Sequence, residues 1–159
     1  MNTKATSRPT IGLLTDWIEQ RYQATVYSGI ADAARSYDTN LACFVIGSLN
    51  EPYDFIAQRN IIAGLINPQQ IDGMIVMAGA LSNYVGVEGL QDFLAPYRQI
   101  PMTGIALALP DMPSILVDNY RGMYDATAHL IEAHGLQRIA FIRGPKGHQE
   151  AEERYQAYA

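Results

Sequence analysis

Aromatic and hydrogen-bonding side chains recur in the segments that follow the apolar, strand-like runs of this sequence. Carboxylate, amide and guanidinium groups hydrogen-bond the hydroxyls of small polar ligands, and an aromatic face packs on the apolar side of a sugar ring. For two of these residues, Trp17 and Tyr22, packing in a hydrophobic core is an open alternative. The whole set is Asp16, Trp17, Tyr22, Ser48, Asn50, Asn83, Tyr84, Asp118, Asn119, His148 and Arg154.

The motifs of nucleotide-binding and hydrolytic enzymes are absent from the sequence. The first apolar run continues as IGLLTDWIEQ, with bulky Trp17 and two acids where a G-x-G-x-x-G loop would bring backbone close to phosphate. No G-x-x-x-x-G-K-[ST] motif occurs, and G-x-S-x-G is missing as well. Neither a dinucleotide site nor a nucleophile elbow is therefore expected.

Histidines and carboxylates do not form a catalytic or metal pattern either. His129 and His134 are five residues apart on one predicted helix, so we expect solvent-exposed or capping roles for them. The acids from Glu150 to Glu153 are expected to favour the start of a helix through its dipole. The sequence predicts a protein that is not an enzyme and that has no cofactor and no metal site.

Composition narrows the class of protein further. The 159 residues are 48% hydrophobic and carry a net charge of −5, which fits one acidic globular domain without a general surface for nucleic acid. Cys43 is the only cysteine, and its apolar surroundings predict a buried core thiol. No signal peptide and no membrane-length apolar run is found, so a cytoplasmic location is expected.

Strand-like runs alternate with segments of helical periodicity. Leu41–Gly47 has no alternation and is expected to be a strand buried on both faces. The fold class predicted from this alternation is α/β, a doubly wound, mainly parallel sheet with helices on both faces. The predicted strands are Ile11–Thr15, Leu41–Gly47, Gly73–Gly79, IPMTGIAL, Ser114–Asp118 and RIAFIRG, and the predicted helices cover about 22–37, 55–66, 90–95 and 119–134, the last ending at Gly135.

Several longer motifs follow one another in a specific order. They are IGLLTDWIEQRYQATVYSGIADAAR, IDGMIVMAG, IPMTGIAL, SILVDNYRGMYDATAHLIEAHGLQRIAFIRGP and the A-x-x-R-Y-x-x-Y of AEERYQAY, which together span about residues 10–159. This order resembles the effector-binding domain of the LacI/GalR family, which has the periplasmic binding protein type I fold. The resemblance implies two α/β lobes joined by three crossovers, with a sugar, nucleobase or similar effector between them.

The resemblance also implies a domain division and a set of site residues. Residues 1–10 would be a disordered leader, 11–145 the N-terminal lobe, and 146–159 a crossover with the start of a truncated second lobe. Arg154 stands where the family's arginine commonly reaches the ligand, and an exposed arginine paired with Glu150 is the alternative. The complete predicted ligand set is Arg154, Tyr22, Asp16, Trp17, His148, Glu150, Asn83 and Asp118.

Two departures from the family pattern bear on function. The ten largely polar residues before the first predicted strand are too few to form the family's helix-turn-helix headpiece, and Ala157 replaces the glycine of R-x-x-G-Y. The segments LNEPYDFIAQRN, LSNYVG and EERYQAYA look closest to a subset of the family in which the sensor is fused to histidine kinase or diguanylate cyclase modules. The main interpretation is a small-molecule sensor lobe that regulates such an output. The alternatives are a transcriptional repressor whose headpiece is removed and a flavodoxin-like or nucleotide-modifying enzyme.

Partners follow from the same interpretation. We expect a small-molecule effector, no direct contact of this segment with nucleic acid and no membrane contact. A lobe without its second half is expected to bind the effector poorly. It would also expose a strand edge and apolar surface that favour association, so a homodimer is an expected state as well.

Overall fold

The structure, a computed structural model, describes residues 8–145 and 148–159. Contacts divide the chain into two units, Met1–Ile115 and Leu116–Ala159, and each is described by itself. Most of the predicted leader 1–10 and the first residues of the predicted crossover, 146–147, lie outside the described residues.

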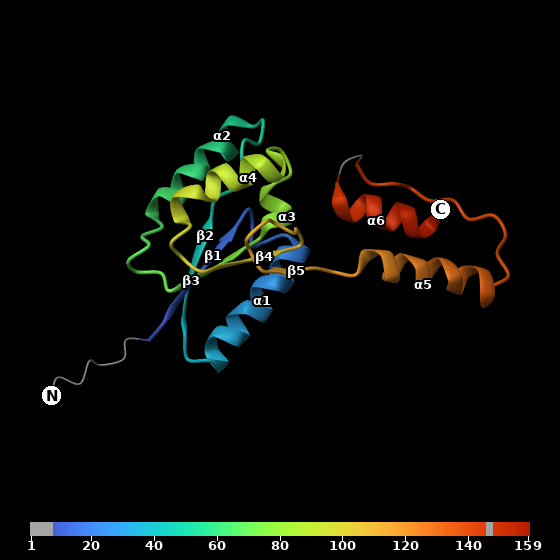
Figure 1. Ribbon diagram of the computed structural model, residues 1–159, viewed down its shortest axis with the longest axis horizontal. Helices are drawn as coiled ribbons and strands as arrows, with labels where there is room; N and C mark the ends of the chain where they lie inside the picture. Colours follow the sequence, from blue (N-terminus) through green and yellow to red (C-terminus); the bar gives the residue numbers. More distant parts are fainter. Residues whose placement is uncertain (1–7, 146–147) are drawn as a thin grey trace. The chain divides into compact units, whose positions relative to one another are not determined.

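A parallel five-stranded sheet with the order β2-β1-β3-β4-β5 forms the centre of the first unit (Figure 1). In the register of the central strands, Leu13 pairs with both Cys43 and Ile75. The predicted α/β parallel sheet is confirmed. Its strands are β1 Thr10–Thr15, β2 Asn40–Val45, β3 Gly73–Val76, β4 Met102–Ile105 and β5 Ser114–Ile115.

Helices cover both faces of this sheet. α1 lies on one face, and α2, η1 and α4 lie on the other (Figure 1). The segment predicted as one helix over 55–66 is mostly the 3₁₀ helix η1, since Asn60, its two isoleucines and Gly64 have modest helix propensity. The helices of this unit are α1 Arg21–Ser36, α2 Asp54–Ala57, η1 Gln58–Leu65, α3 Ala78–Leu81, α4 Gly86–Leu94 and η2 Ala95–Tyr97.

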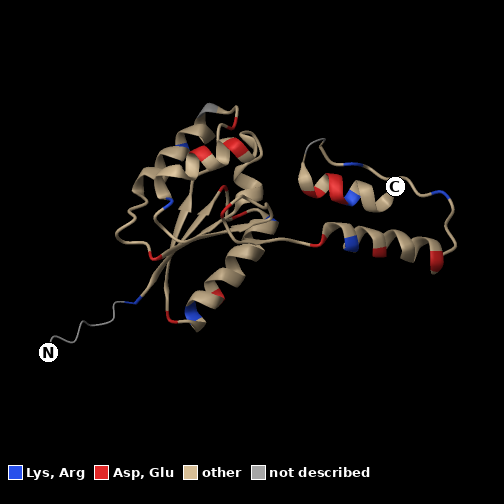
Figure 2. Ribbon diagram, in the orientation of Figure 1, with Lys and Arg blue, Asp and Glu red and all other residues tan. Residues whose placement is uncertain are grey.

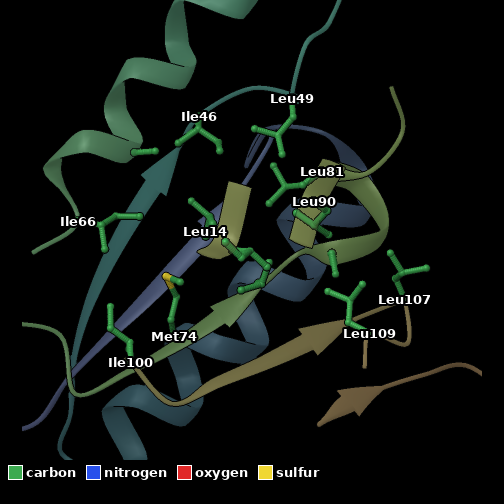
Figure 3. Packing of buried hydrophobic residues seen from close by; sticks show 14 of the residues in the cluster. Leu14, Ile46, Leu49, Ile66, Met74, Leu81, Leu90, Ile100, Leu107 and Leu109 are labelled. Carbon is green, nitrogen blue, oxygen red and sulfur yellow. The ribbon is translucent and has the colours of Figure 1, made fainter. Parts of the chain in front are cut away.

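The main hydrophobic core lies between the sheet and α4 (Figure 3). Parallel pairing puts Leu14 and Val76 on the same face of the sheet, because paired residues in register point to the same side. Leu90 and Leu94, one helical turn apart, bring α4 onto that face. All four side chains are almost completely buried.

The opposite face of the sheet packs against α1 and keeps an open apolar groove. This groove has a volume of about 460 Å³. Leu13 on the same face is 1% exposed, so α1 protects the middle of the sheet and leaves the groove beside it. Its lining residues are Ile11, Leu41 and Ile75 from strands, Val26, Gly29, Ile30, Ala33 and Ala34 from α1, and Tyr37 and Thr39 after it.

The prediction that Cys43 is a buried core thiol is wrong. β2 lies at the edge of the sheet, where helices cover it less than the central strands, and Cys43 is exposed. The expectation that Leu41–Gly47 is buried on both faces fails for the same reason. Partial burial nevertheless raises the pKa of the Cys43 thiol above its ordinary value.

The predicted last strand, RIAFIRG, is also not found. Residues 137–144 have no regular secondary structure, because a strand requires a neighbouring backbone with which to exchange hydrogen bonds. The segment instead contacts α6 (Gln149–Tyr158). The Tyr158 hydroxyl donates to the carbonyl of Ile139 at 2.6 Å, and the rings of Phe141 and Tyr158 stack with centroids 4.8 Å apart.

The second unit is built from α5 (Asn119–Glu132) and α6, which pack against each other. The carboxylate of Asp118 caps α5 by accepting a hydrogen bond from the Arg121 amide at 2.9 Å. Gly135, with φ of 63°, ends the helical region in the left-handed conformation, as predicted. Within the described ranges of both units, no helix is long and apolar enough to cross a membrane.

Candidate functional site

The strand order reverses between β1 and β3, so the carboxyl ends of these two strands are the expected place for a ligand. The chain moves from β1 outward to β2, then returns past β1 to form β3, so the connections leave β1 and β3 on opposite faces. Parallel sheets with this reversal bind ligands beyond the strand ends at the reversal. The segments there are Asp16–Gln20 after β1 and Met77–Asn83 after β3.

Asp16 organises the loop after β1. Its Oδ1 accepts a hydrogen bond from the Trp17 amide at 2.8 Å, and Oδ2 accepts from Gln23 Nε2 at 3.2 Å. The Asp16 carbonyl accepts from the Gly47 amide at 3.0 Å, which joins this loop to the one after β2. Asp16 is 4% exposed and Gln23 9% exposed, so the carboxylate is buried and already hydrogen-bonded. Its geometry supports a positioning role for the loop.

Trp17 is the aromatic group that this loop presents. The guanidinium carbon of Arg59, from η1, lies 4.5 Å from the centroid of the indole ring. Such a cation–π contact orients the ring and places a fixed positive charge beside it. Tyr22, in the first turn of α1, is 50% exposed.

The loop after β2 is held by a side chain of η1. Asn60 Nδ2 donates to the carbonyl of Ile46 at 2.7 Å and to that of Ser48 at 3.3 Å. Gly47 turns the chain at φ of 73°, and a Cβ at this position would lie 2.9 Å from a methyl carbon of Ile56. In the same loop, Glu51 Oε2 is buried without a hydrogen-bond partner in the described part of the chain. A buried acceptor of this kind is suited to a ligand hydroxyl or a water molecule.

The loops after β3 and β4 touch each other. A Cβ on Gly79 would lie 3.0 Å from the Cβ and from the carbonyl oxygen of Ala106, which is tighter than most Cβ contacts, so glycine favours this approach. Ala106 has φ of 65°, a conformation that costs free energy in a residue with a Cβ. Asn83 and Tyr84, which follow α3, are exposed.

In the second unit, Arg154 is held in place by two partners. Its Nη1 donates to Oδ1 of Asn119 and lies 3.7 Å from the Glu150 carboxylate. Asn119 is 8% exposed, and its Nδ2 donates to the carbonyl of Val117 at 3.1 Å. The pairing with Glu150 that the sequence offered as an alternative is therefore present. In addition, the hydrogen bond from Arg154 to Asn119 links α6 to the start of α5.

The remaining predicted residues of this unit have different surroundings. Asp118 is occupied as the helix cap of α5. His148 immediately precedes α6 and has a buried Nδ1 without a hydrogen-bond partner among the described residues. His148 thus shares with Glu51 an unsatisfied polar atom, whereas Asp16 and Asp118 have theirs satisfied.

The predicted ligand set is thereby divided between the units. Asp16, Trp17, Tyr22 and Asn83 belong to the sheet unit, and Asp118, His148, Glu150 and Arg154 to the helical unit. Sequence reasoning did not select Gln23, Arg59 or Glu51. In the sequence, the only signal for these residues is their place near strand ends. The direction of their side chains depends on helix rotation and loop conformation, which the sequence pattern does not give.

Acidic and basic residues both occur on α5 and α6 (Figure 2). In the ranges that the structure describes, no three or more His, Cys, Asp or Glu side chains gather as metal ligands.

The chain is similar to bacterial transcriptional regulators. It is 25% identical over 154 residues to the HTH-type transcriptional regulator RegA of Clostridium saccharobutylicum, covering 94% of this chain and 42% of that protein. It is 27% identical over 154 residues to a ribose operon repressor of Halalkalibacterium halodurans, covering 93% of this chain and 40% of that protein. The chain thus spans less than half the length of these curated relatives.

Solved structures agree with this similarity. The transcription regulator CcpA of Lactococcus lactis superposes with a TM-score of 0.68 at 25% identity, over 95% of this chain and 52% of that chain. No family model matches the sequence. A LacI family transcriptional regulator from Mycobacterium smegmatis superposes with a TM-score of 0.67 at 25% identity, over 93% of this chain and 49% of that chain. The chain therefore shares the fold of about half of these proteins. Because the relatives are transcriptional regulators, the comparisons favour the repressor alternative over a fusion to a signalling module.

The hydrogen bond between Gln23 and Asp16 can be tested by substitution. Gln23→Met keeps the length of the side chain but leaves Asp16 Oδ2 without this donor. We expect the free energy of unfolding to fall by about 1–3 kcal/mol, because a buried acceptor loses its partner. Urea denaturation measures this difference. The control is Gln20→Met, at an exposed position one turn earlier, which should change stability by less than about 0.5 kcal/mol. Equal effects of the two substitutions would contradict the buried hydrogen bond.

Proposed function

We propose that this chain, which has the fold of the first lobe of a LacI-family effector-binding domain, senses a small polar metabolite and regulates transcription as part of a longer protein. The observation that carries the proposal is the similarity of nearly the whole chain to two transcriptional regulators. The chain itself contributes effector recognition. Its net charge of −5 leaves contact with DNA to another segment.

The chemistry of the strand ends supports a sugar or related metabolite. Trp17 offers a ring oriented by Arg59, and Tyr22 adds a second aromatic group. Glu51 and His148 each have a buried polar atom without a hydrogen-bond partner in the part of the chain that the structure describes, and Arg154 is a forked donor. Aromatic faces with a few polar groups are the usual lining of small-molecule sites. The name of one relative, a ribose operon repressor, makes a pentose the first effector to test.

Regulation requires that the effector bind two conformations with different affinity. An effector that binds one conformation more tightly than the other shifts the population toward that conformation. Asp16 and Asp118 are proposed to act indirectly, through the loop and the helix start that they stabilise. Trp17, Tyr22, Asn83, His148, Glu150 and Arg154 are proposed to contact the effector.

Effector binding can be followed through Trp17, the only tryptophan in the chain. We expect titration with ribose, and in parallel with hexoses and nucleobases, to produce a saturable change in tryptophan emission for one of these classes. The Arg154→Met variant should require at least about tenfold more of the same compound, since loss of a hydrogen bond to a charged group costs about 1.5–3 kcal/mol. Arg98→Met, an exposed arginine outside the proposed set, is the control. A response that is linear for every compound would contradict the proposal.

The transcriptional part of the proposal is tested by the gene. Sequencing the reading frame on both sides of the codons for residues 1–159 should reveal a basic helix-turn-helix segment upstream. A kinase or cyclase module in the same frame would overturn the proposed role in transcription and would leave effector sensing intact.

Association of two copies is the partner interaction that the surface supports. The groove beside α1 is lined largely by apolar side chains, and β2 leaves its outer edge without a neighbouring strand among the described residues. Both features favour association. A related fold, that of the Lac repressor, has been solved as a dimer bound to operator.

We expect a homodimer that depends on this groove. Ala33→Lys places a charge in the lining and should shift the sedimentation equilibrium toward the monomer, because burial of an unpaired charge opposes association. Ser28→Lys, on the same helix but outside the lining, should leave the equilibrium unchanged. A wild-type chain that remains monomeric at all concentrations would contradict the dimer.

A further inference from the structure

Two histidines meet where α5 ends. Nε2 of His129 and Nε2 of His134 are 3.1 Å apart, and the ring centroids are 4.9 Å apart with an angle of 82° between the ring planes. Both side chains are exposed. This pair plays no part in the proposed effector site.

The end of the helix produces this juxtaposition. On a continuous helix, residues five apart point about 140° away from each other. Here α5 stops at Glu132, and Gly135 adopts a φ of 63°. The amides of Gly135 and Leu136 donate to the carbonyls of Ile131 and Leu130, at 2.9 and 3.2 Å. The chain therefore folds back over the last turn of α5, and His134 returns toward His129.

We propose that His129 and His134 form a chelating site for a divalent transition-metal ion of the Ni²⁺, Cu²⁺ and Zn²⁺ type. Bonds of about 2.0–2.1 Å from imidazole nitrogen to such an ion place two ligand nitrogens about 2.9 Å apart at a right angle and about 3.4 Å apart at the tetrahedral angle. The observed separation of 3.1 Å lies between these values. Neutral imidazole is a preferred ligand of all three ions.

The chemistry of the pair is compatible with this ligation. In the hydrogen bond between the two Nε2 atoms, one ring donates a proton and the other accepts it. On binding the ion, the donor ring keeps one proton but carries it on Nδ1, so both rings remain neutral and both Nε2 atoms become ligands. Exposure of the rings permits this exchange through solvent.

Water completes the coordination, since no group of three or more His, Cys, Asp or Glu side chains is found in the described ranges. The site therefore suits ions that retain several water ligands. The bound ion would link the last turn of α5 to the segment after it.

The experiment is calorimetric titration of the full chain with Ni²⁺ at neutral pH. We expect one ion per chain. His129→Gln and His134→Gln should each weaken binding by at least about tenfold, because each removes the chelate and leaves a single imidazole. Cys43→Ser, which removes another exposed metal-ligating side chain, should bind Ni²⁺ as the wild type does. Binding that is within twofold of wild type in both single variants would overturn the proposal, as would an equal loss in Cys43→Ser.

A spectroscopic readout identifies the ligands directly. In proton NMR spectra, substoichiometric Ni²⁺ should broaden the imidazole signals of His129 and His134 and leave those of His148 sharp. Uniform broadening of all three would contradict a site at this pair. Because these readouts depend on the metal alone, failure of the effector titration and failure of the metal site are distinguishable.

Discussion

The parallel pairing of β1 with β2 on one side and β3 on the other is the constraint on which the sheet unit depends. It aligns Leu13 with Cys43 and Ile75, so the three strands end at the same edge of the sheet. The segments that follow these three strands take their positions from this register. Asp16, the loop after β2 and the start of α3 are neighbours because the strands preceding them are paired, and a shift by one residue would exchange the two faces of the sheet.

The polar groups at the strand ends fall into two kinds. Asp16 and Asn60 are satisfied by protein partners and fix the backbone of the first two loops. Glu51 after β2 holds a buried oxygen without a partner in the described residues, and so does Nδ1 of His148 before α6 in the second unit. A binding site requires both kinds, because unsatisfied groups can select a ligand only if satisfied groups hold them in place.

Local sequence patterns predicted the type of fold because each central strand is a short apolar run and α1 keeps helical periodicity. They could not distinguish an edge strand from a central one, which is why burial of Cys43 was wrongly predicted. RIAFIRG has the composition of a strand, but pairing depends on a neighbour that lies elsewhere in the chain. For the candidate site, the ends of the predicted strands indicated Asp16 and Trp17, and the family resemblance indicated Arg154. Arg59 and Gln23 lie on helical segments, and their contacts with Trp17 and Asp16 depend on packing that no local pattern contains.

The partners of Arg154 have a consequence for selectivity. Asn119 and Glu150 already occupy hydrogen-bonding directions of the guanidinium group. A ligand that binds Arg154 at these positions must replace the amide oxygen of Asn119 and the carboxylate of Glu150 with acceptors of its own. The net free energy is a difference between two sets of hydrogen bonds, and a ligand with one weak acceptor gains little from it. In the proposed contact with an effector, Arg154 would therefore favour compounds that present two well-placed oxygens over those that present one.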